Sequence, residues 1–436
     1  MKYMMQHRFS RICLRAVAAA TALAAVIFAL PAAHSFGATE RANGAEPSAA
    51  QHFAPLSPTF EVVHSFGGSD GATPDAPLLR DSSGNLYGAT FSGGNTCGFP
   101  AGCGTVFEVD STGAFSVLYA FSGGLDGAEP YSNLIEDGAG NLYGTAFQGG
   151  TGDGVVFQLD SSGKETAIER FNGANGDYPM GGVIMDSSGN LYGTTQGGGS
   201  YGFGTVYKLV PQSGGGWLEA VLYSFQDSSD GGFPEAALVQ DAVGNLYDTA
   251  TSGGSKGLGV VFQVDAGGAY SVLYSFGTNA DDGQGPESGL ILDAGGNLYG
   301  TTFYGGGQGS CPHLAQLGCG VVFKLDTAGD YTALYRFTGK TDGAYPAASL
   351  MLGPSGSLYG TTTSGGLAGC GAKKLGCGVI FRLNTAGNET VLFTSTDGPG
   401  GADPYAGLIT DGAGHAYGTA SAGGDTGDGT VFRITF

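Results

Sequence analysis

The chain has little positive charge, little charge of either sign and a single tryptophan. Of its 436 residues 13% are charged, and 17 Lys and Arg stand against 38 Asp and Glu, which gives a formal net charge of −21. Nucleic acids and anionic membrane surfaces require clustered Lys or Arg, so we expect neither as a partner. A hydrophobic content of 41%, with 26 Phe and 21 Tyr, excludes a chain that stays disordered throughout.

Signatures of catalysis and cofactor binding are also missing. The sequence has no H-x-x-H pair and no glycine-rich loop that ends in Lys-Ser or Lys-Thr. Cysteine and histidine spacings typical of a metal site are absent as well. The sequence therefore predicts no catalytic residue, no cofactor and no metal.

Only one long apolar run occurs, over residues 16–30, and Pro31 and small residues follow it. Four basic residues precede the run: Lys2, Arg8, Arg11 and Arg15. This order is typical of a secretory signal peptide, and the run is shorter than the about 20 residues of a membrane span. A retained anchor is the alternative. We predict a signal peptide over residues 1–38, a disordered lead-in rich in Ala, Pro and Ser over 39–58, and an exported chain without a membrane span.

Glycine is abundant, with 84 residues, and it marks an internal repeat. The string D-G-x-x-P recurs seven times with small variations, and so does N-L-Y-G, always 13 residues from proline to tyrosine. The pairs are Pro74 and Tyr87, Pro130 and Tyr143, Pro179 and Tyr192, Pro234 and Tyr247, Pro286 and Tyr299, Pro346 and Tyr359, and Pro404 and Tyr417. The repeat length varies from 49 to 60 residues. A fixed interior with variable connections indicates a structural module.

Each module contains four short segments rich in β-branched and aromatic residues, for example 116–121, 133–137, 141–145 and 154–160. Turns of the form D-x-x-G, such as 81–84, join neighbouring segments into hairpins, because glycine accepts the positive φ of a tight turn. No window outside the N-terminal run has a helical period. Four antiparallel strands in about 50–60 residues are typical of one blade of a β-propeller.

The two ends of the repeat region complement each other. Residues 60–66 read as a fourth strand without a blade before it, and the last repeat stops after a third strand over 429–434. Pairing these strands would complete the last blade and leave no open sheet edge. The sequence therefore predicts an all-β chain with a single seven-bladed propeller over residues 59–436, closed by its N-terminal strand.

Six cysteines follow the predicted signal peptide, as the pairs Cys97 and Cys103, Cys311 and Cys319, and Cys370 and Cys377. The N-L-Y tyrosine precedes the third-strand aromatic by 20, 24 and 22 residues in these modules and by 14 or 15 in the others, so the cysteines lie in insertions. Local pairs in an exported chain predict three disulfides and a periplasmic or extracellular location. Metal binding is the alternative, but two thiols per site are few.

The blade-to-blade segments and the second-to-third loops of a propeller share one face, so the stapled loops should lie beside the D-G-x-x-P segments. Binding residues are expected there, at the channel mouth. The candidates follow or precede a repeat proline: Asp75, Tyr131, Glu235, Glu287 and Tyr405 follow one, and Tyr178, Phe233 and Tyr345 precede one. Carboxylates beside aromatic rings suit sugars, and a carboxylate pair at the right separation suits glycoside cleavage. The alternative is that these residues are ordinary solvated residues at the entry of each blade.

The aspartates of D-G-x-x-P form a series of their own: Asp70, Asp126, Asp230, Asp282 and Asp342, with Asn175 and Gly400 in the other two repeats. A ring of carboxylates could hold cations. An Asp before Gly more commonly binds its own backbone in a turn, which is the interpretation we favour.

The unit Asp137-x-x-Gly140-Asn141-Leu142-Tyr143-Gly144-Thr145, followed by Gly149-Gly150 and Gly154-Val155-Val156-Phe157, resembles the choice-of-anchor tandem-repeat family called GloVer. The resemblance covers residues 60–436. It implies a bacterial repeat protein that is exported, and it lends no chemistry. Family members often end in a surface-sorting tail, whereas this sequence stops at Phe436 on a strand, so the resemblance does not extend to anchoring by that route.

Two functions remain in view. The first is a non-enzymatic binding module for a glycan, a cell-surface polymer or an extracellular protein, which uses the stapled face as a monomer. The alternative is a polysaccharide lyase or hydrolase at the channel mouth.

Overall fold

Strands and connecting loops make up the residues that the computed structural model describes, which are 58–97, 101–279, 281–307, 311, 317–353, 355–370 and 375–436. They belong to one contact unit, Ser57–Phe436. The predicted signal peptide over 1–38 and residues 39–57 of the predicted lead-in lie outside the described residues. No helix in the described ranges is long and apolar enough to cross a membrane.

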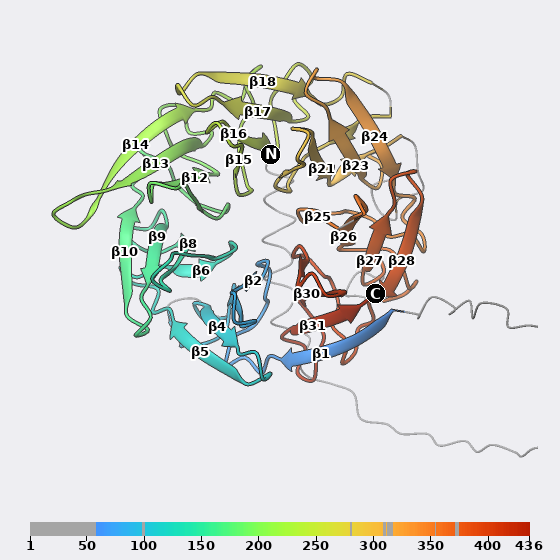
Figure 1. Cartoon of the computed structure of the whole chain (residues 1–436), viewed down its shortest axis with the longest axis horizontal. Helices are drawn as coiled ribbons and strands as arrows, with labels where there is room; N and C mark the ends of the chain where they lie inside the picture. The colour runs from blue at the N-terminus through green and yellow to red at the C-terminus, as the bar shows by residue number, and fades with distance from the viewer. Residues whose placement is uncertain are drawn as a thin grey trace, which may run out of the picture. The chain divides into compact units, whose positions relative to one another are not determined.

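Seven antiparallel sheets of four strands follow one another around a ring (Figure 1), so the predicted seven-bladed propeller is confirmed. From the innermost strand outward, blade 1 is β2 (Leu79–Arg80), β3 (Leu86–Thr90), β4 (Thr105–Val109) and β5 (Phe115–Ala120); blade 2 is β7 (Ile135–Glu136), β8 (Leu142–Gln148), β9 (Val155–Leu159) and β10 (Glu165–Arg170); blade 3 is β11 (Ile184–Met185), β12 (Leu191–Thr195), β13 (Thr205–Pro211) and β14 (Trp217–Ser224). Blade 4 is β15 (Val239–Gln240), β16 (Leu246–Ala250), β17 (Val260–Val264) and β18 (Tyr270–Ser275); blade 5 is β20 (Ile291–Leu292), β21 (Leu298–Thr302), β23 (Val321–Leu325) and β24 (Tyr331–Arg336); blade 6 is β25 (Met351–Leu352), β26 (Leu358–Thr362), β27 (Val379–Leu383) and β28 (Glu389–Thr394); blade 7 is β29 (Ile409–Thr410), β30 (His415–Ala420), β31 (Thr430–Thr435) and β1 (Thr59–Ser65). The D-G-x-x-P segments add β6 (Ala128–Pro130), which pairs with β8, and β19 (Gly283–Gln284), which pairs with β22 (Tyr304–Gly305).

The N-terminal strand closes the ring, as predicted. β1 pairs antiparallel with β31 from Thr59 opposite Thr435 to Ser65 opposite Thr430 (Figure 1). Beside this strand pair, Thr419 Oγ1 of blade 7 donates a hydrogen bond to the carbonyl oxygen of Ala76 in blade 1 at 3.2 Å. The two ends of the repeat region therefore hold each other with contacts of the kind that join other blades.

Aromatic side chains fill the interfaces between blades. The phenylalanine after the fourth strand of one blade meets the third-strand aromatic of the next blade edge-on, as in Phe121 with Phe157 and Phe171 with Tyr207, at centroid distances of 5.2 and 5.1 Å. The third-strand ring in turn covers the glycine of N-L-Y-G. A Cβ built on Gly144 would lie 2.8 Å from Phe157 Cζ, so the glycine gives the ring its space.

The repeat prolines are held in the same way. A Cβ on Gly154, the residue before β9, would lie 2.4 Å from Cδ of Pro179 in blade 3, and a Cβ on Gly429 would lie 2.5 Å from Cδ of Pro74. Both glycines have positive φ, +95° and +102°. Each proline thus packs on the preceding blade while the N-L-Y-G strand packs in its own blade. These two fixed contacts explain why 13 residues always separate proline from tyrosine.

Candidate functional site

The backbone at the mouth of the ring has the same unusual conformation in every blade. The residue before each repeat proline has φ between +52° and +61°, and only one of the seven is glycine: Thr73, Glu129, Tyr178, Phe233, Gly285, Tyr345 and Asp403. This left-handed conformation costs about 1–2 kcal/mol for a residue with a side chain. Hydrogen bonds to the preceding blade hold it; for example, Tyr178 N–H donates to the carbonyl of Asp153 at 2.9 Å.

We use the name rim for the seven residues that follow these prolines: Asp75, Tyr131, Met180, Glu235, Glu287, Ala347 and Tyr405. The structure brings three of the predicted candidates together, although they come from blades 2, 5 and 7. The rings of Tyr131 and Tyr405 meet edge-on with centroids 6.0 Å apart. Tyr405 Oη also lies 3.4 Å from Glu287 Oε2, and Tyr131 packs against Phe91 at 5.9 Å. Two aromatic faces and a carboxylate therefore form one cluster.

The remaining rim residues differ in their exposure. Glu235 Oε1 accepts a hydrogen bond of 2.6 Å from Gln196 Nε2 of blade 3, which fixes the carboxylate between two blades. Asp75 is half-buried, whereas Met180 and Ala347 are buried. The rim thus presents acids and tyrosines and no basic side chain.

The three aromatic candidates before proline pack on the preceding blade. Tyr178 stacks on Phe147 at 4.9 Å, Phe233 meets Phe203 at 5.4 Å, and Tyr345 stacks on Phe303 at 5.0 Å. Tyr178 and Phe233 stay half-buried, while Tyr345 is only 4% exposed. Tyr345 therefore lies in the packing beneath the surface, and the other two rings border the rim.

Below the rim, the innermost segments of neighbouring blades come very close together. A Cβ on Gly181 would lie 2.1 Å from the carbonyl oxygen of Ala236, and a Cβ on Gly407 would lie 2.9 Å from that of Ser349. A larger residue does not fit at either glycine, and the residue two places after the proline is Gly, Ala or Ser in every repeat. Large side chains can therefore gather only at the rim itself. The run of small residues was readable in the sequence, but its meaning depended on the distance between blades.

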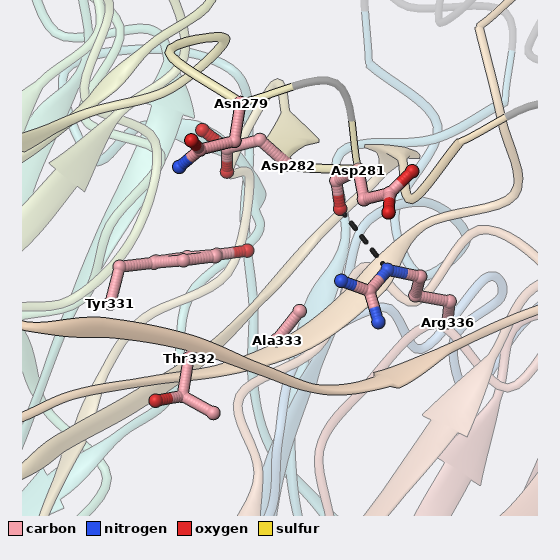
Figure 2. A pocket seen from close by; sticks show the side chains of 7 residues that line it. All are labelled: Asn279, Asp281, Asp282, Tyr331, Thr332, Ala333 and Arg336. Atoms are coloured by element: carbon pink, nitrogen blue, oxygen red, sulfur yellow. Dashed lines mark hydrogen bonds between the residues drawn. The ribbon is translucent and has the colours of Figure 1, made fainter.

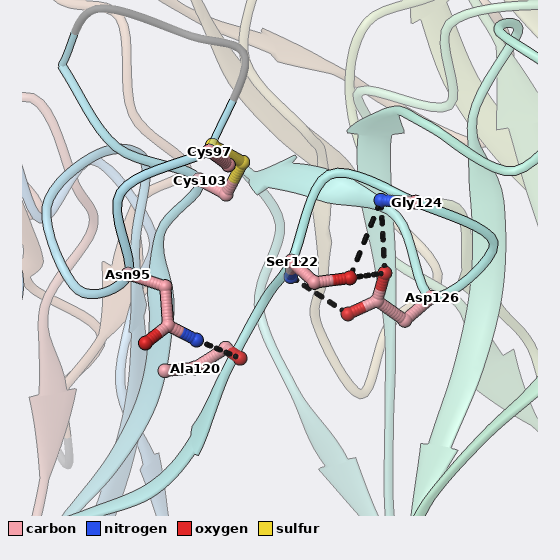
Figure 3. Close-up of a disulfide and its surroundings, with 7 residues drawn as sticks. All are labelled: Asn95, Cys97, Cys103, Ala120, Ser122, Gly124 and Asp126. Atoms are coloured by element: carbon pink, nitrogen blue, oxygen red, sulfur yellow. Dashed lines mark hydrogen bonds between the residues drawn. A yellow bond between two sulfur atoms is a disulfide. The ribbon is translucent and has the colours of Figure 1, made fainter.

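All three predicted disulfides are present: Cys97–Cys103, Cys311–Cys319 and Cys370–Cys377, with Cα–Cα distances of 6.1, 5.5 and 5.3 Å. The second cysteine of each pair has its carbonyl oxygen bonded to the N–H of the residue before the next blade's proline, at 2.8–2.9 Å. The stapled loops therefore lie on the same face as the rim, and they support its strained backbone in blades 2, 6 and 7. Figure 3 shows the first disulfide beside the turn of Asp126.

Glu129 is a residue that sequence reasoning missed. It has the left-handed conformation before Pro130, and its N–H donates to the carbonyl of Cys103 at 2.8 Å. Burial raises the pKa of its carboxyl group to about 7. A carboxyl group that changes its charge near neutral pH therefore lies next to Tyr131 and the first disulfide loop.

The aspartates of D-G-x-x-P are turn residues, as the favoured interpretation had it. Asp126 accepts hydrogen bonds from the N–H groups of Ser122 and Gly124 and from Ser122 Oγ (Figure 3). It also accepts one of 3.0 Å from Tyr119 Oη at the outer edge of blade 1. Asp230 and Asp342 bond to Tyr223 and Tyr335 in the same way. These carboxylates accept hydrogen bonds from their own turns and from the outer strand, away from the rim.

The two exceptions in this series follow from their neighbours. Asn175 replaces aspartate where the outer strand carries Glu169, and Asn175 Nδ2 donates to Glu169 Oε1 at 3.2 Å, which a carboxylate could not do. Gly400 replaces aspartate where the outer strand carries Phe393, a side chain without a hydroxyl to donate. The partner lies six to eight residues earlier in each repeat, so this relation was readable in the sequence.

A pocket of about 410 Å³ lies at the outer edge of blade 5 (Figure 2). Arg336 lines it, and its Nε donates to the carbonyl of Asp281 at 3.2 Å. Arg170 makes the equivalent bond to the carbonyl of Leu125 in blade 2, at 3.0 Å. The arginine thus has a structural role that recurs in another blade. Within the described ranges, no group of three or more His, Cys, Asp or Glu is arranged to hold a metal.

Three of the solved structures that the chain resembles do so at low identity. A Bacteroides uniformis protein described as a 6-phosphogluconolactonase is 15% identical, with 73% of this chain and 83% of that chain covered and a TM-score of 0.46. A gluconolactonase of Xanthomonas campestris is 10% identical, with 87% and 89% covered and a TM-score of 0.42. A Dyadobacter fermentans protein of unknown function is 10% identical, with 86% and 98% covered and a TM-score of 0.44.

No curated protein matches the chain. The family model described as the Gloeobacter/Verrucomicrobia repeat matches it three times, over residues 34–242, 146–313 and 244–436. These matches run through every blade, and they agree with the resemblance stated from the repeat unit. The chain belongs to the Gloeobacter/Verrucomicrobia repeat family.

Proposed function

We propose that the protein is exported and acts as a binding module, which holds an extracellular glycan at the rim. The observation that carries the proposal is the convergence of Tyr131, Glu287 and Tyr405 from three blades that are distant in sequence. Sugar rings pack on tyrosine faces, and carboxylate oxygens accept hydrogen bonds from sugar hydroxyls. The three disulfides support an oxidising compartment.

The rim is well suited to binding because its backbone is fixed before any ligand arrives. Each rim residue follows a proline that packs on a glycine of the preceding blade, and the three stapled loops support the rim beside blades 2, 6 and 7. A ligand held here loses little affinity to the ordering of the protein. An extracellular protein as ligand is the nearest variant of this proposal.

The test is retention of the full chain on a panel of plant and bacterial polysaccharides, with released reducing ends and unsaturated products measured in the same samples. The double variant Tyr131→Ala/Tyr405→Ala should bind a retained polysaccharide at least about tenfold more weakly, because central aromatic contacts are commonly worth more than 1 kcal/mol. Tyr201→Ala is the matched control, since Tyr201 is 56% exposed and lies outside the rim.

Equal binding by the double variant and the wild type would refute the rim as the site. If products appear and vanish in Glu235→Gln/Glu287→Gln, the protein is a polysaccharide lyase or hydrolase instead. If no polysaccharide is retained, the glycan proposal fails.

A further inference from the structure

Seven equivalent positions line the interfaces between the outer strands of consecutive blades. Each is the fourth-strand residue opposite the last buried residue of the third strand, as Phe115 is opposite Val109, and we call it the seam position. In four interfaces it carries an aromatic ring stacked on a ring of the preceding blade, with centroids 3.6–4.5 Å apart. These pairs are His64 with Phe115, Tyr223 with Tyr270, Tyr274 with Tyr331, and Phe393 with Phe60.

The other three interfaces carry glutamate at the seam position: Glu165, Glu219 and Glu389. In all three, the Oε1 atom is buried and has no hydrogen-bond partner. A buried oxygen without a hydrogen-bond partner destabilises the fold, and does so more strongly when it is charged. The same costly arrangement thus occurs three times where four other blades have a stack of rings.

Each of these glutamates meets a second acid at its interface. Asp126 acts electrostatically on Glu165, and Asp342 acts on Glu389. Glu219 faces Glu169, and Asn175 Nδ2 donates to both at 3.2 Å. We call these three interfaces the acidic seams; they join blades 1 and 2, 2 and 3, and 5 and 6.

The other polar groups at the acidic seams leave most of this negative charge uncompensated. Arg170 is the cation that acts on Glu165 and Glu169. The hydroxyls of Tyr119 and Tyr335 already donate to Asp126 and Asp342, and the hydroxyl of Tyr207 is buried without a partner near Glu169 and Glu219. These hydroxyls are neutral, so they do not offset the second charge that forms when a seam glutamate ionises.

Ionisation of these glutamates is correspondingly unfavourable. Burial, with Asp126 adding to it, raises the pKa of Glu165 to about 7, and burial with Asp342 does the same for Glu389. Burial also raises the pKa of Glu219 and Glu169. The folded protein therefore keeps protons that the unfolded chain releases above its ordinary glutamate pKa. Between that value and about 7, stability falls as the pH rises.

We propose that the acidic seams are a pH-sensitive clamp: protonated glutamates hold the blades together in mild acid, and their ionisation loosens three of the seven interfaces towards neutral and alkaline pH. The aromatic interfaces do not respond. The ring would then be tightest in mildly acidic surroundings, and blade 2, which has an acidic seam on both sides, would loosen first.

The test compares the full chain with the double variant Glu165→Gln/Glu389→Gln, because glutamine keeps the shape of the protonated acid and cannot ionise. The denaturant midpoint of the wild type should fall from pH 5 to pH 8, and the fall should be clearly smaller in the variant, which still contains the buried acids Glu129, Glu219 and Asp248 with raised pKa values. Asp397→Asn/Asp425→Asn is the matched control: it removes two charges from exposed positions and should keep the wild-type pH dependence. A variant with the same pH dependence as the wild type would overturn the proposal.

Amide hydrogen exchange of the wild type gives a second test, which does not depend on a variant. After correction for the intrinsic effect of pH, protection in β10 and β28 should fall by about tenfold or more between pH 5.5 and pH 8 relative to β1, whose interfaces are aromatic. An equal loss of protection in all blades, or none, would overturn the clamp. Neither result depends on the ligand proposed for the rim.

Discussion

Replacing Asp248 by glycine should stabilise the protein, and the gain should grow as the pH rises. Asp248 is the only residue other than glycine at the fourth position of the N-L-Y-G strings. It is completely buried in β16, between Leu246 and Ala250 on a face packed with Leu238 and Phe262. Neither carboxyl oxygen has a hydrogen-bond partner.

The magnitude has two parts. A neutral carboxyl group buried without hydrogen bonds destabilises the fold by about 1–3 kcal/mol, and the glycine variant recovers this free energy. The variant loses about 0.5–1 kcal/mol of the gain, because glycine is flexible in a strand. The second part depends on pH. Burial raises the pKa of Asp248 well above its usual range, against a smaller opposing effect of the Thr249 N–H. The unfolded chain releases this proton near pH 4 and the folded chain retains it, so the wild type loses about 1.4 kcal/mol per pH unit until its folded pKa is reached.

Denaturant unfolding of the wild type and Asp248→Gly at pH 5 and pH 7 measures both parts. The variant should unfold at higher denaturant at both values, and its advantage should increase by up to about 3 kcal/mol from pH 5 to pH 7. Asp248→Asn is the control that removes ionisation and keeps a buried polar group, so its advantage over the wild type should also grow with pH but should be small at pH 5. An advantage of Asp248→Gly that is absent, or that stays constant with pH, would refute the reasoning.

Two further predictions concern the frame of the rim. Gly181→Ala should prevent folding or lower the unfolding midpoint strongly, because its Cβ would lie 2.1 Å from the carbonyl oxygen of Ala236. Gly138→Ala is the control and should unfold like the wild type, because the space around its Cβ is open. Equal midpoints for the two variants would contradict the close approach below the rim. Cys97→Ser/Cys103→Ser should lower the free energy of unfolding by about 2 kcal/mol, because the disulfide closes only a short loop. The far-ultraviolet circular dichroism spectrum of the folded variant should stay unchanged. Loss of the β-sheet spectrum would show that the blades depend on this disulfide.

The fold was readable from the sequence because every blade repeats the same contacts. The constant 13-residue spacing from Pro130 to Tyr143 reflects two packing sites, and the turn residues and strand patterns agree with them. Ring closure was predictable because an unpaired strand stood at each end. The disulfides were predictable because the cysteines are close together in insertions. The repeat thus supplied the proline-to-tyrosine spacing seven times.

The rim was predictable as a position but not as an arrangement. Tyr131 and Tyr405 are far apart in sequence, and no local pattern says that their rings meet or that Tyr405 Oη approaches Glu287. The contact between these side chains depends on how closely the innermost segments of the blades approach one another, and that distance is set only when the whole ring is assembled. Asp248 is the opposite case: the departure from N-L-Y-G was visible in the sequence, but its complete burial came only with the structure.

Departures from the repeat carry different information in different places. At the outer interfaces a changed residue is matched by its neighbour: Glu169 occurs with Asn175, and Phe393 occurs with Gly400. Such matched changes preserve hydrogen bonding and packing, so they belong to the fold. At the rim, the residues after the prolines differ from blade to blade while the backbone beneath them stays the same. Variation on a fixed backbone is what a binding surface requires. The rim is therefore the place where the protein's specificity should be sought.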